Sequence, residues 1–290
     1  MEAARVAALR GHQVMLYEKE HRLGGQLNMA AILRDEYESL ARYLSGQLRK
    51  LGVQVVLGKE VGQCIIKSIA PDSVIVATGS VPSIPDIPGI NGGNVIVPGG
   101  FYFEGSPGQS SLATLVGLRR MIIRFGFALL KRSVGAWLVK LMLGILVPFG
   151  KKVVIMGGGL PGVELANFLV QRGKEVTILE TGEAMVEATT PMYYLANHLS
   201  RKLAAKGVTM LTGVQYERIT GRGIVITTGD GERSILDADT VIVATGQQAS
   251  SGIAQGLQRN VPEVHLVGDC VTPCGIMEAI HAGSRIGRAI

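Results

Sequence analysis

The chain has 290 residues, enough for two domains of ordinary size, and its hydrophobic content of 47% supplies an ample core. Aromatic residues make up only 5%, and 39 glycines suit tight strand-to-helix turns, a composition that argues against a β-sandwich. The formal charge of +6 does not indicate a nucleic-acid partner, because six of the 29 Lys and Arg residues fall in one acid-free segment between Arg119 and Lys140.

The chain begins with a charged, alanine-rich helical pattern over residues 2 to 10, which Gly11 ends. It has no apolar stretch of the kind that a signal peptide needs. A short apolar strand over residues 14 to 18 follows and ends in Glu18. Helix and acid-ended strand form the second half of a strand, turn, helix, strand unit, so we expect the first strand and its glycine turn to be missing before Met1. A short natural N-terminus on a degenerate domain is the alternative.

Residues 22 to 79 continue this first domain. The pattern predicts a glycine loop at 22 to 27, a helix at about 35 to 51, and strands at 53 to 57 and 73 to 76. The last strand runs into Ala77-Thr78-Gly79, and a linker with Pro82, Pro85 and Pro88 comes next.

The segment 106 to 149 is basic and apolar. Leu118, Met121, Ile122, Phe125 and Leu129 follow helical spacing, beside four cations at Arg119, Arg120, Arg124 and Lys131. No part of it offers about 18 uncharged apolar residues, so a spanning helix is not expected. We expect a helical insertion. It either lies on an anionic membrane surface or a partner subunit, or packs against its own domain with solvated arginines.

The most informative stretch is the run from Val153 to Glu164, which contains Gly157-Gly158-Gly159-Leu160-Pro161-Gly162. It predicts a buried strand, a G-x-G-x-x-G turn and the start of a helix, which is a dinucleotide-binding fingerprint in its proper context. Gly157 allows the tight turn, Gly159 lets the backbone approach a pyrophosphate, and Gly162 lets the helix pack on the strand. The helix N-terminus then presents N–H groups to the phosphates.

Glu180 closes the next apolar run, 18 residues past Gly162. An acid in this place accepts a hydrogen bond from a ribose 2′-hydroxyl, and no Arg follows it to neutralise a 2′-phosphate. The pattern therefore favours NAD(H) over NADP(H).

The two halves of the chain repeat one another. An acid-ended strand, a helix, a strand and an Ala-Thr-Gly ending occur in residues 14 to 79 and again in 176 to 246, the second ending being Ala244-Thr245-Gly246. Beyond them, a strand at 264 to 267 leads into Gly268-Asp269, and a helix is expected from Gly275 to Ile290.

The cysteines, Cys64, Cys270 and Cys274, are too few and too oddly placed for a disulfide framework, so a reducing cytoplasm is expected, with membrane association if the basic segment binds lipid. Cys270 and Cys274 lack two further metal ligands nearby and are expected to be buried small residues beside a cofactor. No metal site is predicted.

These motifs together resemble the two-dinucleotide-binding-domain flavoproteins, in which an FAD domain is interrupted by an NAD(P)H domain. Within them, the chain is most similar to the C-terminal half of the 2,4-dienoyl-CoA reductase, enoate reductase and trimethylamine dehydrogenase relatives. The segments that carry this similarity are residues 1 to 12, Leu23-Gly24-Gly25-Gln26-Leu27 and Glu278-Ala279-Ile280-His281. The resemblance covers nearly the whole chain except roughly residues 100 to 150. Neither cysteine pair of the related disulfide reductases, Cys-x4-Cys or Cys-x2-Cys, is present.

The resemblance implies an α/β fold of two interleaved Rossmann-like three-layer domains with a helical insertion. Residues 1 to 90 and 247 to 290 would bind FAD, and 91 to 246, including the 106 to 149 insertion, would bind NAD(H). By resemblance, Glu18 holds the FAD ribose, Gly24 to Gln26 line the flavin, Asp269 binds the ribityl chain and the last helix points its N-terminus at the flavin.

Glu164 resembles an acid near the nicotinamide, and a helix-surface role is an equal alternative. His281 is expected to pack inside its helix rather than act as a base, because hydride transfer through a flavin needs no protein base. No catalytic side chain is therefore predicted. The expected cofactor contacts are Glu18, Lys19, Gly24, Gly25, Gln26, Ala77, Thr78, Gly79, Gly157, Gly159, Leu160, Pro161, Gly162, Glu164, Glu180, Ala244, Thr245, Gly246, Gly268, Asp269 and Ile280.

The function that follows is hydride transfer from NADH to FAD. By resemblance, the electrons then reach FMN and an iron-sulfur centre in an upstream part or partner and reduce an activated carbon-carbon double bond. Two alternatives are a module that retains a nucleotide without redox turnover, and an interaction module that docks on a membrane or a partner. The missing first glycine turn would also weaken FAD retention.

Overall fold

The computed structural model describes residues 1–97, 150–186, 192–257 and 261–290, so the insertion expected at 106 to 149 lies outside the described residues. These residues form two compact units: the first holds residues 1–81 and 247–290, and the second holds residues 82–246 in its described part. The first unit ends before the boundary expected at residue 90, because Ile87 and Ile90 pack against the core of the second unit.

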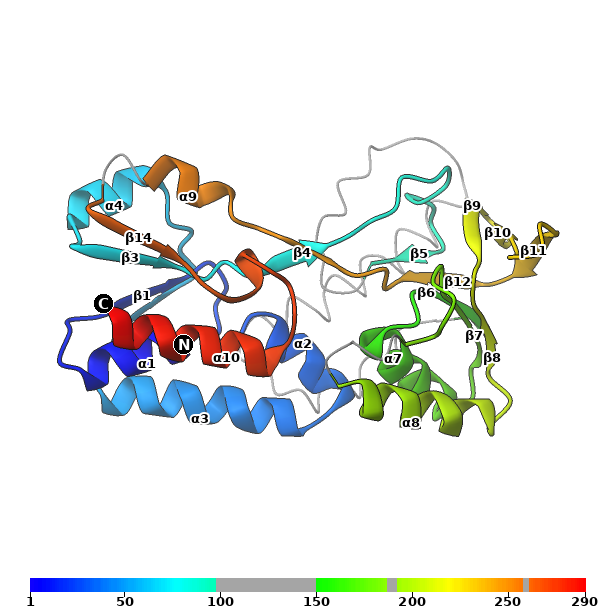
Figure 1. Cartoon of the computed structure of the whole chain (residues 1–290), viewed down its shortest axis with the longest axis horizontal. Coiled ribbons are helices and arrows are strands. Elements are labelled where there is room, and N and C mark those ends of the chain that lie inside the picture. Colours follow the sequence, from blue (N-terminus) through cyan, green and yellow to red (C-terminus); the bar gives the residue numbers. More distant parts are fainter. Residues whose placement is uncertain (98–149, 187–191, 258–260) are drawn as a thin grey trace. The chain divides into compact units, whose positions relative to one another are not determined.

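The first unit combines short parallel strands with helices on both sides (Figure 1). Strands β1 and β2 pair in parallel, and so do β3 and β14. Its elements are α1 (Glu2–Leu9), β1 (Met15–Glu18), α2 (Gln26–Leu33), α3 (Glu36–Lys50), β2 (Gln54–Leu57), α4 (Gln63–Ile69), β3 (Ser73–Val76), α9 (Gly252–Leu257), β14 (Glu263–Leu266), the 3-10 helix η1 (Gly268–Cys270) and α10 (Ile276–Ala289).

Helices α1, α3 and α10 pack together below β3 and β14 in the view of Figure 1, and α4 and α9 lie on the opposite side. Glycines let α10 approach α1 closely, since a Cβ at Gly287 would meet the carbonyl oxygen of Ala3 and the side chain of Val6. A small apolar core, which includes Ile66, Val76 and Leu257, joins α4 and α9 to the strands. The layers are therefore helix, sheet and helix.

The second unit is built on a five-stranded parallel sheet of order β5-β12-β6-β7-β8. A three-stranded antiparallel sheet, of order β11-β10-β9, packs on one of its faces. Its elements are β5 (Val95–Ile96), β6 (Lys152–Met156), α7 (Leu160–Val170), β7 (Glu175–Leu179), α8 (Tyr193–Ala204), β8 (Thr209–Leu211), β9 (Gln215–Thr220), β10 (Gly223–Thr227), β11 (Arg233–Asp237) and β12 (Thr240–Val243).

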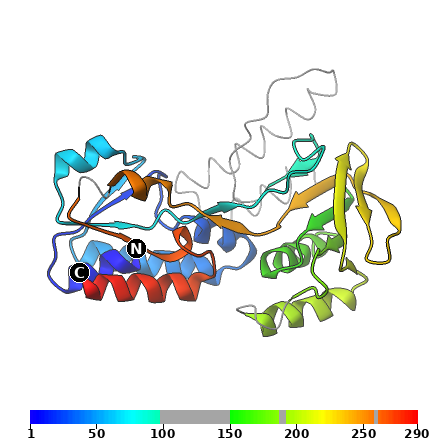
Figure 2. The ribbon, with the colours of Figure 1, turned by 45° about the horizontal axis from the view of Figure 1, so that its top comes forward.

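Alternate residues of the central strands face opposite layers, as the period of a β-strand requires. Val154 and Met156 point into the core shared with the antiparallel sheet, where they meet Ile224 and Ile226. Helix α7 contacts β6 and β7, and α8 packs on α7, which gives the arrangement seen in Figure 2. The central strands are near-continuous apolar runs because both of their faces are covered.

Two further strands, β4 (Ser80–Pro82) and β13 (Gln247–Ala249), pair with each other where the chain passes between the units. The α/β class is confirmed, and the expected helices and strands around Glu18, Gly157 and Glu180 are present. The helix expected within the second repeat is α8, whereas the antiparallel sheet and helices α2, α4 and α9 were not expected from the sequence.

Candidate functional site

The glycine turn between β6 and α7 is shaped by tight backbone packing on two sides. Gly157 has a φ of +108°, and a Cβ there would overlap the carbonyl oxygen of Ala244 at the end of β12. A Cβ at Gly162 would overlap the carbonyl oxygen of Gly157, so α7 starts in direct contact with the turn. The two outer glycines of the fingerprint therefore serve backbone packing.

Gly159 differs from both. The nearest atom to a Cβ placed there is Pro161 Cδ at 3.8 Å, so this part of the turn is open to an approaching group. Gly159 is also the N-cap of α7, an 11-residue helix whose first-turn N–H groups have no partners within the helix. Pro161 lies in the first turn, where its missing N–H costs nothing. The open glycine and the helix N-terminus together form a seat for an anionic group such as a pyrophosphate.

Glu180 lies at the end of β7, directly beside the turn. Its Oε2 accepts a hydrogen bond from the Gly158 N–H at 2.7 Å, and its Oε1 accepts one from the Gly182 N–H at 2.9 Å. The Thr181 hydroxyl donates to Oε1 at 3.2 Å. Oε2 accepts only one of these three bonds, so the half-buried group can still accept from a ribose hydroxyl through Oε2.

The main chain around Glu180 is held by the turn that follows β8. The Glu180 N–H donates to the Leu211 carbonyl at 2.8 Å, and its own carbonyl accepts from the Val214 N–H at 3.2 Å. The Gly213 N–H donates to the Gly182 carbonyl at 2.8 Å. The acid therefore stands on a backbone that is fixed on both sides.

Tyr216 on β9 also contacts the main chain next to Glu180, and the sequence did not predict this contact. Its hydroxyl donates to the Leu179 carbonyl at 3.0 Å, the same oxygen that accepts the Gly157 N–H at 2.7 Å. Burial raises the pKa of the Tyr216 phenol well above its ordinary value, the nearby Glu180 charge raises it further, and the Gly157 N–H opposes both. The phenol is therefore neutral, and it is a donor beside the acid.

The second Ala-Thr-Gly ending frames the same turn. The Ala244 N–H donates to the Met156 carbonyl at 2.7 Å, and Ala244 also closes the space beside Gly157. The Thr245 hydroxyl donates to the Ser83 carbonyl at 2.6 Å, while the Gly246 carbonyl accepts the Ser83 N–H at 3.0 Å. These contacts hold the incoming linker at the edge of the site.

Glu164, in the second turn of α7, is 8% exposed. The helix-surface role considered for it is therefore wrong, because the side chain is buried on the face that packs inward. A buried carboxylate is costly unless partners hold it, and Glu164 does have a polar partner in this structure.

In the first unit, the predicted FAD residues fall into four local groups, with Ile280 in addition. Glu18 at the end of β1 is half-buried, its Oε1 accepts the Glu20 N–H at 3.0 Å, and Lys19 beside it is exposed. Gly24 and Gly25 have φ of +121° and +50° and lead into α2, whose first residue, Gln26, donates to the Ser80 carbonyl at 2.8 Å. Both glycines adopt backbone that other residues rarely do.

The third group lies at the start of the C-terminal helix. Gly268 has a φ of +73°, and Asp269 Oδ1 accepts the Cys274 N–H at 3.3 Å in the loop that leads to α10. The Ala77-Thr78-Gly79 ending lies elsewhere in this unit, where the Thr78 hydroxyl donates to the Ser250 carbonyl at 2.5 Å. Asp269 is half-buried and faces the first residues before α10.

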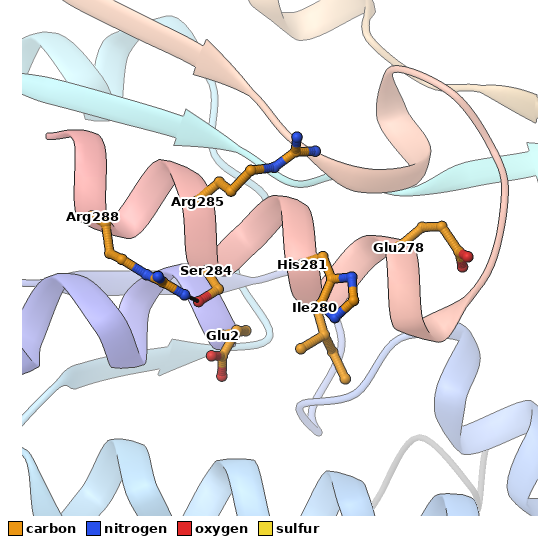
Figure 3. Close-up of a pocket in the computed structure, with 7 residues that line it drawn as sticks. All are labelled: Glu2, Glu278, Ile280, His281, Ser284, Arg285 and Arg288. Atoms are coloured by element: carbon orange, nitrogen blue, oxygen red, sulfur yellow. Dashed lines mark hydrogen bonds between the residues drawn. The ribbon is translucent and has the colours of Figure 1, made fainter.

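A pocket of about 470 Å³ lies between α1 and α10 in the first unit (Figure 3). Glu2, Glu278, Ile280, His281, Ser284, Arg285 and Arg288 line it. Ile280 is the one predicted cofactor contact in this lining. The packing role expected for His281 is wrong, because this residue is exposed.

The cysteines do not behave alike. Cys270 is fully buried, and its thiol lies 3.2 Å from the carbonyl oxygens of Val76 and Val267. Cys274 is exposed, so the expectation that both are buried is wrong for it. Desolvation, and then the charges of Glu278 and Asp269, raise the pKa of the Cys274 thiol. A raised thiol pKa disfavours the reactive thiolate.

Among the residues that the structure describes, no cluster of three or more His, Cys, Asp or Glu could hold a metal ion. Within the same residues, none of the helices has the length and apolar character that crossing a membrane requires. Among the predicted residues of the second unit, Gly157, Gly159, Gly162 and Glu180 lie together at the turn between β6 and α7.

A parallel sheet with a glycine turn, a helix N-terminus and an acid at the next strand end defines a dinucleotide-binding oxidoreductase fold. The family model described as "Pyridine nucleotide-disulphide oxidoreductase" matches residues 1–285. The chain belongs to the pyridine nucleotide-disulphide oxidoreductase family. It is accordingly an NAD(P)H-dependent flavin oxidoreductase module that takes FAD and a pyridine nucleotide.

Individual relatives agree with this family. A cinnamate reductase from Clostridium sporogenes is 30% identical over 294 residues, which cover 100% of this chain and 37% of the relative. An NADH oxidase from Thermoanaerobacter brockii is 29% identical over 99% of this chain and 38% of its own length. A solved structure of 2-naphthoyl-CoA reductase with 2-naphthoyl-CoA matches with a TM-score of 0.76 and 29% identity, over 100% of this chain and 38% of that one.

The chain thus spans less than two fifths of the length of these relatives. The resemblance to the enoate reductase-like flavoproteins, drawn from the sequence motifs, is confirmed.

Proposed function

We propose that the glycine turn at Gly157 to Gly162 and the acid Glu180 hold NADH, and that bound FAD accepts its hydride at N5. The observation that carries the proposal is the contrast within the turn: Gly157 and Gly162 are closed by backbone atoms, whereas the space at Gly159 is open beside the α7 N-terminus. This arrangement leaves one seat for a pyrophosphate. No side chain of the chain is assigned a proton-transfer step.

NADH rather than NADPH is the proposed nucleotide. The Glu180 carboxylate stands where the adenosine ribose would lie, and Thr181, Gly182 and Glu183 follow it without a cation. A 2′-phosphate would meet the charge of Glu180, with Glu183 nearby in the chain, and would find no Arg in residues 181–186. Like charges in a half-buried site repel strongly enough to select against the phosphorylated nucleotide.

The first unit is proposed to hold FAD. Glu18 is the acceptor for its adenosine ribose, and Lys19 beside it is a further contact. The Gly24-Gly25 loop before α2, with positive φ at both residues, would allow the isoalloxazine ring to approach the backbone. Gly268 and Asp269 stand before α10, a 14-residue helix whose N-terminus favours negative charge. Ala77, Thr78, Gly79 and Ile280 in this unit, and Leu160, Pro161, Glu164 and the 244–246 ending in the other, remain proposed cofactor contacts.

The whole protein is proposed to pass electrons onward to FMN and an iron-sulfur centre that lie in another part of the polypeptide or in a partner. The support is that relatives of greater length include a cinnamate reductase and a 2-naphthoyl-CoA reductase. An activated carbon-carbon double bond is the substrate class that this similarity suggests.

The test is an anaerobic mixing experiment with the purified chain reconstituted with FAD. NADH should bleach the flavin absorbance band in one phase, faster than NADPH at equal concentration. The Glu180→Ala variant should need a higher NADH concentration for the same rate, and the Gly221→Ala variant, altered at an open position of the same unit, should not.

Bound FAD that NADH does not bleach would contradict hydride transfer. NADH binding without bleaching would instead support the alternative, a module that retains its nucleotide without turnover.

A second candidate role concerns the segment 106–149, which lies outside the described residues. Its sequence alone favours contact with an anionic membrane or a partner subunit, since six cations stand between Arg119 and Lys140 without an acid. Flotation with anionic liposomes should carry the whole chain upward and leave a variant without residues 106–149 behind. Equal flotation of the two would remove the membrane role.

A further inference from the structure

A tyrosine from the antiparallel sheet reaches the strand junction beside the nucleotide seat, although nothing in the fingerprint requires it. Tyr216 belongs to β9, which pairs with β10 in antiparallel register. Its hydroxyl donates at 3.0 Å to the Leu179 carbonyl, the last peptide oxygen before Glu180. The antiparallel sheet therefore contacts the end of β7 through a specific polar group as well as through apolar packing.

A β-bulge aims this side chain. Val225 pairs with Arg218 and the next residue, Ile226, pairs with Tyr216, so Glu217 is an extra residue on β9. In a regular strand Tyr216 and Ile219 would face opposite sides. With the bulge both face inward: Ile219 is buried in the core, and Tyr216 packs against the same core.

The Leu179 carbonyl is a shared acceptor. It receives the Gly157 N–H at 2.7 Å and the Tyr216 hydroxyl at 3.0 Å, so one oxygen joins the first glycine of the turn, the end of β7 and the antiparallel sheet. The next peptide carries Glu180, whose carboxylate binds the Gly158 N–H. The packing against the Ala244 carbonyl also holds Gly157, so a shift of the Leu179 peptide would chiefly move the acid that follows it.

We infer that Tyr216 is a positioning residue of the nucleotide site: its hydroxyl fixes the Leu179 peptide and thereby holds Glu180 in line with the adenosine ribose. The inference rests on the proposed function, because it assigns Tyr216 to the same site. Tyr216 does not itself touch the ribose. Its effect is confined to recognition of the ribose hydroxyl that Glu180 accepts.

This role has a specific signature in binding. Tyr216→Phe keeps the ring and its packing and removes only the hydroxyl. In calorimetric titration of the full chain, we expect the Kd for NADH to rise about fivefold, the size of one lost neutral hydrogen bond. The Kd for an NADH analogue without the adenosine 2′- and 3′-hydroxyls should stay unchanged, because that analogue has no ribose hydroxyl to donate a hydrogen bond to Glu180.

Two controls separate positioning from general damage. Tyr194→Phe removes a hydroxyl from a residue of the same unit that is 87% exposed, and it should leave both Kd values unchanged. In a Glu180→Ala background, Tyr216→Phe should add nothing to the loss of NADH affinity, since the acid it positions is gone.

The outcomes distinguish this inference from the proposed function. If the wild-type chain does not bind NADH, the proposed function fails and the inference fails with it. If the wild type binds NADH and Tyr216→Phe leaves the Kd unchanged, weakens both ligands equally, or acts as strongly without Glu180, only the role of Tyr216 is overturned. A thermal melt of each variant checks that the fold is retained.

Discussion

The two acid-ended strands, β1 in the first unit and β7 in the second, match in sequence pattern but differ in their surroundings. β7 is the fourth strand of a five-stranded sheet, and its acid, Glu180, binds N–H groups of the glycine turn and of the next loop. β1 pairs with a single strand, and the carboxylate of Glu18 accepts an N–H from its own turn, that of Glu20. An acid is therefore placed for recognition chiefly by the backbone that surrounds it.

The two Ala-Thr-Gly endings, unlike the two acids, make almost the same hydrogen bonds. Thr78 donates its hydroxyl to the Ser250 carbonyl, and Gly79 accepts the Ser250 N–H at 3.2 Å. Thr245 donates in the same way to Ser83, and Gly246 accepts the Ser83 N–H at 3.0 Å. In each unit, the same pair of hydrogen bonds thus joins the Ala-Thr-Gly ending to one serine of that unit. The two halves of the chain therefore repeat one another in structure at these endings.

The largest effect on NADH affinity is expected when a side chain is added in the glycine turn beside Glu180. Gly162→Ala places a Cβ on the carbonyl oxygen of Gly157, which is backbone and cannot move away cheaply. Alanine would gain about 1 kcal/mol of helix propensity, and the overlap costs about 1–3 kcal/mol, so the overlap wins. NADH affinity should fall about hundredfold through lost phosphate contacts.

Calorimetry with NADH and a thermal melt measure both effects of Gly162→Ala. Gly221→Ala is the matched control, because its added Cβ meets nothing within 4 Å in the β9 to β10 turn. Full NADH affinity in Gly162→Ala would show that the turn is not the nucleotide seat.

A smaller effect is expected when the acids themselves are changed one at a time. Glu180→Gln leaves one acceptor oxygen for the Gly158 and Gly182 N–H groups and removes the charge, so NADH should bind about tenfold more weakly. The same substitution in the other unit, Glu18→Gln, should leave the NADH Kd unchanged. Equal losses in both variants would contradict the assignment of NADH to the second unit.

The hydrogen bonds of Thr78 and Thr245 are expected to contribute unequally to the free energy of unfolding. Thr245 is half-buried, so Thr245→Val should lower the free energy of unfolding by about 1 kcal/mol. Thr78 is exposed, and water can replace its bond, so Thr78→Val should cost no more than a few tenths, about 0.3 kcal/mol. Urea unfolding of the two variants measures the difference. A larger loss at Thr78 would reverse the ranking.

Substitution of a cysteine is expected to have the smallest effect on NADH-dependent flavin reduction. Because desolvation and two neighbouring carboxylates raise the pKa of Cys274, alkylation of this thiol should reach half its maximal rate above about pH 8.5, the ordinary cysteine value. A Cys64→Ser variant isolates Cys274 for the measurement, since Cys270 is buried. Cys274→Ser should keep full NADH-dependent flavin reduction, and its loss would point to thiol chemistry.

The sequence predicted the strand, glycine turn and helix around Gly157 well because the determinants of this local structure are close together in the chain. Glycine spacing, the apolar run before it and the acid after it lie within about 30 residues of a single strand, helix and strand unit. Backbone needs at Gly157 and Gly162 are visible as residue identities. The same holds for the α10 start at Gly275, where the helix was expected.

What could not be predicted depends on pairing between distant residues. The antiparallel sheet shares its core with β6 and β12. No local sequence pattern predicts that it packs on these strands. Tyr216 was missed because a period of two places it on the outer face, and the bulge at Glu217 reverses that. His281 was assigned a packing role because the proposed chemistry needs no base, and Cys274 was expected to be buried beside a cofactor, yet both residues are exposed.

The most direct test of the central claim is a crystal structure of the chain grown with NADH. It should show the pyrophosphate at the Gly159 N–H and the α7 N-terminus, with the adenosine ribose hydroxyls bonded to Glu180. NADH seated on Glu18 in the first unit, or an unchanged glycine turn with the nucleotide bound elsewhere, would contradict the account.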